Sequence, residues 1–182
     1  MILESAPWKD ELLKIAFRLE KRKQQRRWLE TSFAKLEMEV FIAAYCIRKL
    51  FEAAKTSSST TAYQFNVKAY RFIGTNITKI NWHEFDEHYD LRKPKIFRKD
   101  ALFICNQLVH SYVFAPDLKR TGGLRGIFFC SDRERHSWLY LLAIDELIRY
   151  LKKVGRDYPN YSSSCFDPKR RDYVITHQEM LK

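Results

Sequence analysis

The fold is decided first by the stretch LETSFAKLEMEVFIAAYCIRKLFEAA, residues Leu29–Ala54. Its apolar residues recur mostly every three or four positions, which is the spacing of one buried face of an α-helix. The middle of the stretch, Val40–Ile47, is apolar all round, as expected of a central helix that is covered on several sides. The stretch therefore predicts a long helix in the core.

A second helix is expected just before it. Ser5 can cap a helix, Pro7 suits a first helical turn, and an apolar stripe from Leu12 to Leu19 leads into the charged run EKRKQQRR. No Gly or Pro between Gln24 and Arg27 forces a break, so the two segments could also form one long bent helix. We prefer a turn there.

Two further helices follow from the same reasoning. The run RKDALFICNQLVHSYVF, Arg98–Phe114, has a strongly apolar helical pattern. Near the end of the chain, Asp145 can cap a last helix, DELIRYLKKV, which Gly155 would end.

Strand signals are weaker. Phe65, Val67 and Ala69 alternate with polar residues, and the β-prone runs GIFFC and HSWLYLLAI on either side of SDRER suggest a hairpin. Residues 56–96 read as a long connection with a helical turn at WHEFDEHYDL, and residues 156–182 as an irregular tail with a short strand at DYVIT. With only five Gly and five Pro, the expected fold is mainly α, a helical bundle with a small β-hairpin in a single domain, residues 1–182.

Composition narrows the chemistry. The four cysteines are scattered without a Cys-x-x-Cys pair, so neither a zinc ribbon nor a disulfide framework is expected. The two His and four carboxylates of His83–Asp90 could attract a divalent ion, but the spacing of the two His is wrong for a zincin, and an acidic surface turn is the simpler interpretation. No Gly-rich phosphate loop, apolar membrane span or signal peptide is apparent. We expect no metal, cofactor or membrane, and a cytoplasmic location.

The formal net charge of +11 favours a polyanionic partner, first of all nucleic acid, although a solvated basic surface or docking on an acidic neighbour fits as well. Three basic clusters stand out, of which the third is Lys169–Arg171. In the first cluster, arginines recur every four residues and so share one face of a helix. The second cluster precedes the apolar run at Arg98–Phe114. The candidate nucleic-acid-binding residues are Arg18, Arg22 and Arg26 in the first cluster, and Arg92, Lys93, Lys95, Arg98 and Lys99 in the second.

A candidate catalytic group lies in the Arg98–Phe114 run. Asn106 and His110 are four residues apart, so in a helix they share one face, and imidazole is suited to proton transfer near neutral pH. Arg48 follows the apolar YCI of the central helix and could supply a cation, or it could simply pair with Glu52 one turn later. Asn106 and His110 could likewise satisfy polar groups within the core.

The segment CNQLVH, Cys105–His110, resembles the signature of the HEPN superfamily, helical domains that include many endoribonucleases. That signature is an Arg, a polar residue that is often Asn, and then a His. Asn106 and His110 match the polar residue and the His, whereas Cys105 stands where the Arg should be. The resemblance implies an all-α fold, a composite site at a dimer interface acting on the 2′-hydroxyl and phosphate of RNA, and membership of toxin or antiviral defence systems.

The sequence thus predicts a basic, HEPN-like protein that engages RNA and cleaves it without metal. His110 would move a proton, Asn106 would position His110 or the phosphate, and Arg48 or Arg98 would offset developing charge. The alternative is a non-enzymatic accessory or scaffold subunit that binds nucleic acid or an acidic protein partner. Either form could act as a homodimer or with another protein.

Overall fold

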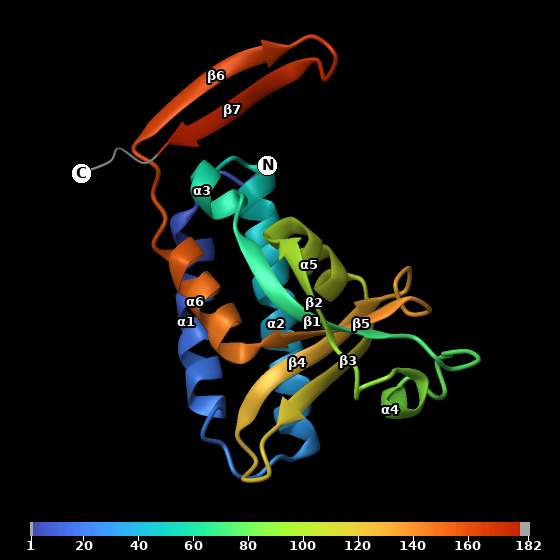
Figure 1. Ribbon diagram of the computed structural model, residues 1–182. Coiled ribbons are helices and arrows are strands. Elements are labelled where there is room, and N and C mark those ends of the chain that lie inside the picture. Colours follow the sequence, from blue (N-terminus) through green and yellow to red (C-terminus); the bar gives the residue numbers. More distant parts are fainter. Residues whose placement is uncertain (1, 179–182) are drawn as a thin grey trace.

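The computed structural model describes residues 2–178, and two long helices form one layer of it (Figure 1). Helix α1 (Ala6–Arg22) begins with Pro7 in its first turn, and α2 (Glu30–Glu52) is the long core helix expected from the apolar spacing. Both predictions are confirmed, and the chain turns between them. The indole of Trp28 in this turn donates a hydrogen bond of 2.7 Å to the carbonyl oxygen of Gly122, which anchors the turn to another turn far along the chain.

A five-stranded sheet forms the second layer, so the prediction of a mainly α bundle with a small β-hairpin is wrong. All neighbouring strands are antiparallel, in the order β2-β1-β5-β4-β3. The first strand therefore lies beside the last one, a long-range pairing that local sequence patterns do not reveal. The strands are β1 (Gln64–Arg71), β2 (Lys95–Asp100), β3 (Ser111–Leu118), β4 (Leu124–Ser131) and β5 (Trp138–Ala143).

The run Arg98–Phe114 is not one helix. It contains the end of β2, the short helix α5 (Ala101–Val109) and the start of β3. The side chain of Asp100 accepts a hydrogen bond of 2.7 Å from the backbone N–H of Phe103 and so caps α5 at its start. The apolar runs on either side pair as strands with β1 and β4, and this pairing outweighs the helical spacing.

Helix α6 (Ile144–Gly155) follows β5 without a loop and packs against α1. Asp145 does not cap it, because β5 ends at Ala143 and places Asp145 in the first turn, where it pairs with Lys23 at 2.6 Å. Gly155 lies inside the last turn rather than after it. A side chain there would come within 2.7 Å of Leu13, so the glycine allows α6 to approach α1 closely.

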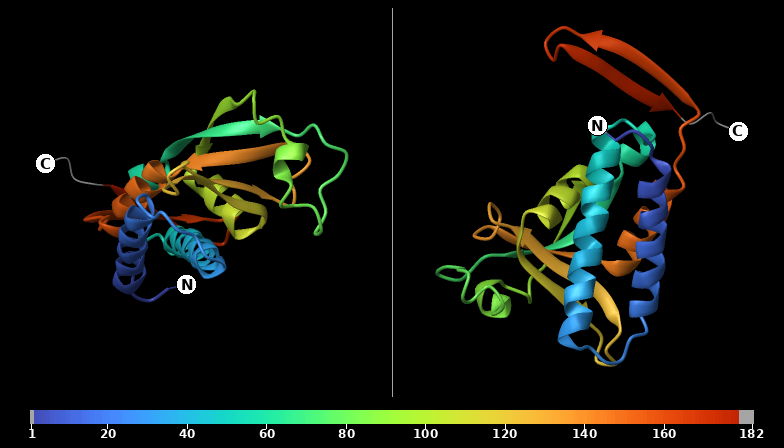
Figure 2. Two further views of the ribbon diagram at one scale, coloured as in Figure 1. Left: turned by 90° about the horizontal axis from the view of Figure 1, so that it is seen from below. Right: turned by 180° about the vertical axis from the view of Figure 1, so that it is seen from behind.

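All the long helices cover the same face of the sheet (Figure 2). Strand alternation turns Phe65, Val67 and Ala69 of β1 toward them, together with Phe129 of β4 and Tyr140 of β5, to form the main core. We refer to the opposite face as the open face. None of the helices in residues 2–178 combines the length and the apolar character needed to cross a membrane.

Residues 56–96, expected to be a long connection, contain regular structure. They include α3 (Ser58–Thr61), β1, α4 (Phe85–His88) and the start of β2. The helical turn expected near Phe85 is confirmed. Only residues 72–94 form a true connection, and they carry α4 across one end of the open face.

The end of the chain was expected to be irregular with one short strand. Instead, β6 (Tyr161–Asp167) and β7 (Asp172–Gln178) pair as a hairpin that projects away from the helical layer (Figure 1). The predicted strand at DYVIT is β7. Its partner YSSSCFD was missed because three consecutive serines resemble a loop and hide the strand pattern.

Candidate nucleic-acid interface

The residues predicted to be catalytic lie around α5 but do not assemble. His110 is the exposed C-cap residue of α5, and Asn106 is half-buried one turn earlier. Neither side chain has a hydrogen-bond partner within residues 2–178. The hydrogen bonds of His110 are made by its backbone, whose N–H donates to the carbonyl oxygen of Asn106 and whose carbonyl accepts from the N–H of Asp132.

Arg48 lies next to a different part of α5. Its guanidinium is 3.7 Å from Glu52, the simple pairing on α2 that the sequence also allowed, and its Nε is buried without a hydrogen-bond partner in the described chain. Arg48 also interacts electrostatically with Cys105, which is 3% exposed. Burial raises the pKa of the Cys105 thiol to about 12, although the charge of Arg48 acts in the opposite direction. Cys105 is therefore a neutral core group in place of the expected Arg.

Arg98, the other candidate cation, is on the far side of the sheet from α5. It lies opposite Asn66 in the pairing of β1 with β2, and Asn66 lines a hollow on the open face. His110 belongs to the helical layer. The two groups cannot meet across the sheet.

The first basic cluster is largely neutralised within the protein. Arg18 and Arg22 on α1 both contact the carboxylate of Glu39 at 3.0 Å, and Arg18 also contacts Glu11 at 2.7 Å. The side chain of Glu39 is only 8% exposed, so this group ties α1 to α2 as part of the core boundary. Arg26 is separate and lines a basic hollow beside the β3–β4 turn.

The second basic cluster follows the free edge of the sheet. Its residues lie on β2, just before β2, and on the neighbouring β1. None of them forms an ion pair with any side chain that the structure describes, although Lys95 and Lys99 rest against aromatic rings. We define the β2 edge band as these seven cations: Lys68, Arg71, Arg92, Lys93, Lys95, Arg98 and Lys99.

Five of the seven band residues were predicted from the charged run around β2. Lys68 and Arg71 were missed. Lys68 takes a polar position of the alternating pattern in β1, and Arg71 lies at the end of that strand. Finding them required knowing that β1 pairs with β2, because only this pairing brings residues so distant in sequence together along one edge.

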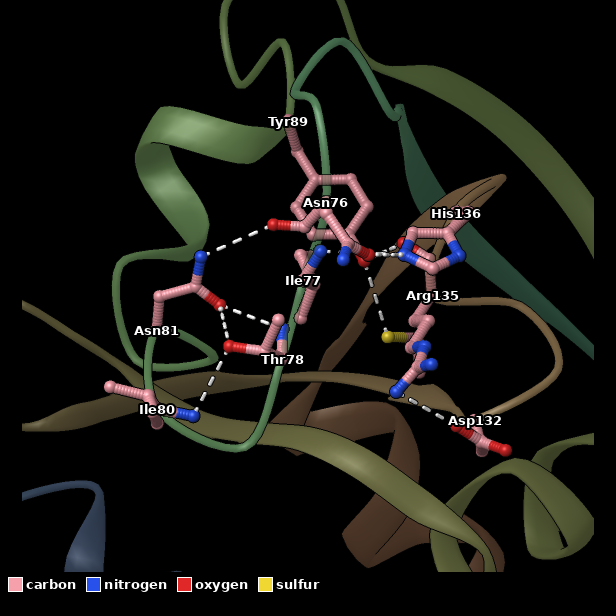
Figure 3. A network of polar contacts seen from close by, with 10 residues as sticks. Asn76, Ile77, Thr78, Ile80, Asn81, Tyr89, Asp132, Arg135 and His136 are labelled. Carbon is pink, nitrogen blue, oxygen red and sulfur yellow. Dashed lines mark hydrogen bonds and ion pairs between the residues drawn. The ribbon is translucent and has the colours of Figure 1, made fainter.

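The band adjoins a connection that is rigidly tied to the sheet (Figure 3). His136 in the β4–β5 turn contacts Asn76 at 2.9 Å and accepts a hydrogen bond from the N–H of Ile77, while Tyr89 donates to the carbonyl oxygen of Arg135 at 2.6 Å. Ile77 and Tyr89 are buried with Tyr70 and Leu139 of the sheet in a second small core. The connection covers one end of the open face and leaves the rest bare.

Metal chemistry finds no support at His83–Asp90. His83 is exposed beside Glu84, whereas His88 is 8% exposed and its ring stacks with that of Phe72. Nowhere between residues 2 and 178 do three His, Cys, Asp or Glu side chains group closely enough to hold an ion.

Comparison with known proteins adds no relative: no protein-family model, curated protein or solved structure matches the chain.

Proposed function

We propose that the protein binds nucleic acid through the β2 edge band as a non-enzymatic accessory or scaffold subunit in the cytoplasm. The single observation that supports this function is that seven cations lie along one edge of the sheet without a carboxylate partner in the described chain, whereas Arg18 and Arg22 of the first basic cluster are paired internally. Unpaired Lys and Arg side chains gain most from phosphates, because binding releases the counterions condensed on a nucleic acid. RNA is the preferred ligand in this proposal.

The band also has an ordinary structural explanation. Charged residues on an edge strand prevent another chain from pairing with it, and β2 is an edge strand with Lys and Arg along it. This explanation requires charges on β2 alone. It gives no reason for the unpaired Lys68 and Arg71 on β1 or for Arg92 and Lys93 before β2.

RNA cleavage remains a prediction without geometric support. The mechanism requires His110, Asn106 and a cation around one phosphate. His110 lies at the exposed end of α5 and Asn106 along its side, whereas the cation Arg48 lies beside buried Cys105. The HEPN resemblance, with its implied role in toxin or defence systems, also stays a prediction, and the all-α architecture that it implied is not the one found.

Binding and cleavage can be tested together. Labelled single-stranded and duplex RNAs are incubated in EDTA with the wild type and with the variant Arg92→Gln, Lys93→Gln, Arg98→Gln, whose three side chains are exposed. A matched control, Lys14→Gln, Arg149→Gln, Arg156→Gln, removes the same number of Arg and Lys from exposed positions on or just after α1 and α6.

We expect salt-sensitive binding that is lost in the band variant and kept in the control, without cleavage. Equal losses in both variants would show that only net charge matters and would contradict a defined interface. Cleavage that persists in EDTA and disappears in His110→Ala would restore the enzymatic function.

A further inference from the structure

The bare part of the open face contains a cavity of about 450 Å³. This volume lies in the range of small-molecule sites, roughly 300–1,000 Å³. All five strands contribute to its lining, and Leu91 from the connection forms part of its wall. The cavity is therefore built on rigid elements that are held from behind by the main core.

A β-bulge places an arginine at this cavity. Asp117 of β3 pairs with Gly126 of β4, and Leu118 pairs with Leu124, so Arg125 is the extra residue of β4. Its Nε and Nη2 donate to the two carboxylate oxygens of Asp117 at 2.6 and 2.5 Å. The Asp117 side chain is 8% exposed and that of Arg125 is 63% exposed. The buried carboxylate thus fixes a guanidinium whose Nη1 has no partner in the described chain.

Polar groups of β1 line the same cavity without partners. Tyr70 is 6% exposed, yet no residue between 2 and 178 forms a hydrogen bond with its hydroxyl. The side chains of Asn66 and Lys68 lie four and two residues before it on the same face and are likewise unpaired among the described side chains. The Tyr70 hydroxyl opens to this cavity and is therefore free to donate a hydrogen bond to a ligand.

The rest of the lining is apolar. Phe128 and Leu141 are paired on neighbouring strands and form a surface on which a flat ring can lie, and Ile96 lies on the other side of Lys68. The charged lining groups are Lys68, Arg125 and Asp117, which leaves one net positive charge. An apolar floor, donors at its edge and an unneutralised cation together fit a ligand with an aromatic ring and an anionic group.

We propose that this cavity binds one unstacked nucleotide of a single-stranded nucleic acid, with its base on Phe128 and Leu141 and its phosphate at Lys68, the lining cation that no carboxylate neutralises. The inference rests on the proposed function, because Lys68 belongs to both the β2 edge band and the cavity. A strand that follows the band reaches the cavity at Lys68. Stacking on a protein surface requires an unpaired base, so the cavity gives the protein a preference for single strands over duplexes.

Two variants of the cavity leave its charges unchanged. Tyr70→Phe removes only the hydroxyl, and its control is Tyr45→Phe, at an exposed tyrosine on α2. Ala143→Phe fills the cavity from an exposed lining position, and its control is Ala34→Phe, at an exposed position of α2. Thermal melts followed by circular dichroism establish that each variant folds.

Affinity is measured by fluorescence anisotropy with a labelled single-stranded RNA, its DNA counterpart and an RNA duplex. We expect Tyr70→Phe to weaken single-strand binding about fivefold through one lost hydrogen bond. Ala143→Phe should weaken it by at least about tenfold through lost stacking. Duplex binding and both controls should match the wild type. Free adenosine or uridine monophosphate is titrated in competition with the single strand. At saturation, it should lower the affinity of the wild type for the single strand to that of Ala143→Phe and no further.

The outcomes separate this inference from the proposed function. If both cavity variants bind single strands like the wild type while Arg92→Gln, Lys93→Gln, Arg98→Gln loses binding, the cavity proposal is overturned and the band remains. If free nucleotide binds the cavity but neither cavity variant changes the affinity for single strands, the proposal that the cavity holds a nucleotide of a strand is also overturned. If the wild type binds no nucleic acid, both proposals fail.

Discussion

The basic face of α1 and the basic edge of β2 carry the same kinds of side chain in opposite electrostatic environments. Arg18 and Arg22 share the nearly buried carboxylate of Glu39, which fixes both guanidinium groups against the protein. Arg98 and Lys93 have no ion-pair partner in the described chain. The difference indicates that the first group stabilises the packing of α1 on α2, whereas the second is free to bind an external anion.

Reversing the charge of the edge should have the largest effect. In the variant Arg92→Glu, Lys93→Glu, Arg98→Glu, attraction to phosphates becomes repulsion, and we expect affinity for single-stranded RNA to fall on the order of a hundredfold at moderate salt. Fluorescence anisotropy measures this loss. A change below about threefold would mean that the edge does not contact the nucleic acid.

Breaking the ion pairs of α1 with Glu39 should lower the stability of the fold rather than the RNA affinity. Arg22→Gln leaves Glu39 buried with only Arg18 as partner, so the free energy of unfolding should fall by about 2 kcal/mol. Urea denaturation measures this change, and RNA affinity should be unaffected. The exposed Arg149→Gln is the control, with an expected change within about 0.5 kcal/mol. If Arg22→Gln lost RNA affinity but kept its stability, the roles assigned to the basic face of α1 and the β2 edge would be contradicted.

Much of the helical layer could be predicted from the sequence, because the apolar spacing in α1 and α2 is local information. The strands β1, β4 and β5 were also recognised from alternation and β-prone runs. The pairing of these strands into one sheet could not be predicted, because β1 and β5 are far apart in the sequence. The run Arg98–Phe114 was also misread, since its apolar residues belong to a strand, a helix and a second strand.

The site was predictable to a similar extent. The run Arg92–Lys99 is visible as charge, but nothing local distinguishes it from the α1 cluster, because Glu39 lies seventeen residues after Arg22. Tyr70 and Arg125 carry no sequence signal. Their common position depends on strand pairing and on a bulge.

Alkaline pH should lower the free energy of unfolding, because three of the cysteine thiols are buried. Burial raises the pKa of Cys46 and Cys130 to about 11 and that of Cys105 to about 12. In the unfolded chain these thiols ionise near pH ~8.5, so the stability is fully present below that pH and falls as the pH rises, by about 1.4 kcal/mol per pH unit for each thiol.

Urea unfolding under reducing conditions between about pH 8 and about pH 10 measures this slope. Cys105→Ala should make it shallower by one thiol's contribution. A stability that is constant over this range would show that the thiols are not buried. Exposed Cys165 should be the thiol that reacts fastest with a disulfide reagent in the native protein.

The smallest effect is expected at His110. Because its side chain is exposed and has no partner within residues 2–178, His110→Ala should change the free energy of unfolding by less than about 0.5 kcal/mol and leave RNA affinity unchanged. Urea denaturation and anisotropy test both points. A clear loss of binding would place His110 at the interface and extend the site to the end of α5.

The most direct test of the central claim is the salt dependence of single-strand affinity, measured for the wild type, for Arg92→Gln, Lys93→Gln, Arg98→Gln and for Lys14→Gln, Arg149→Gln, Arg156→Gln. Each lost phosphate contact should reduce the slope of log affinity against log salt by about 0.7. The band variant should therefore lose about two units of slope, and the control none. Equal slopes for the two variants would contradict a nucleic-acid interface on the β2 edge.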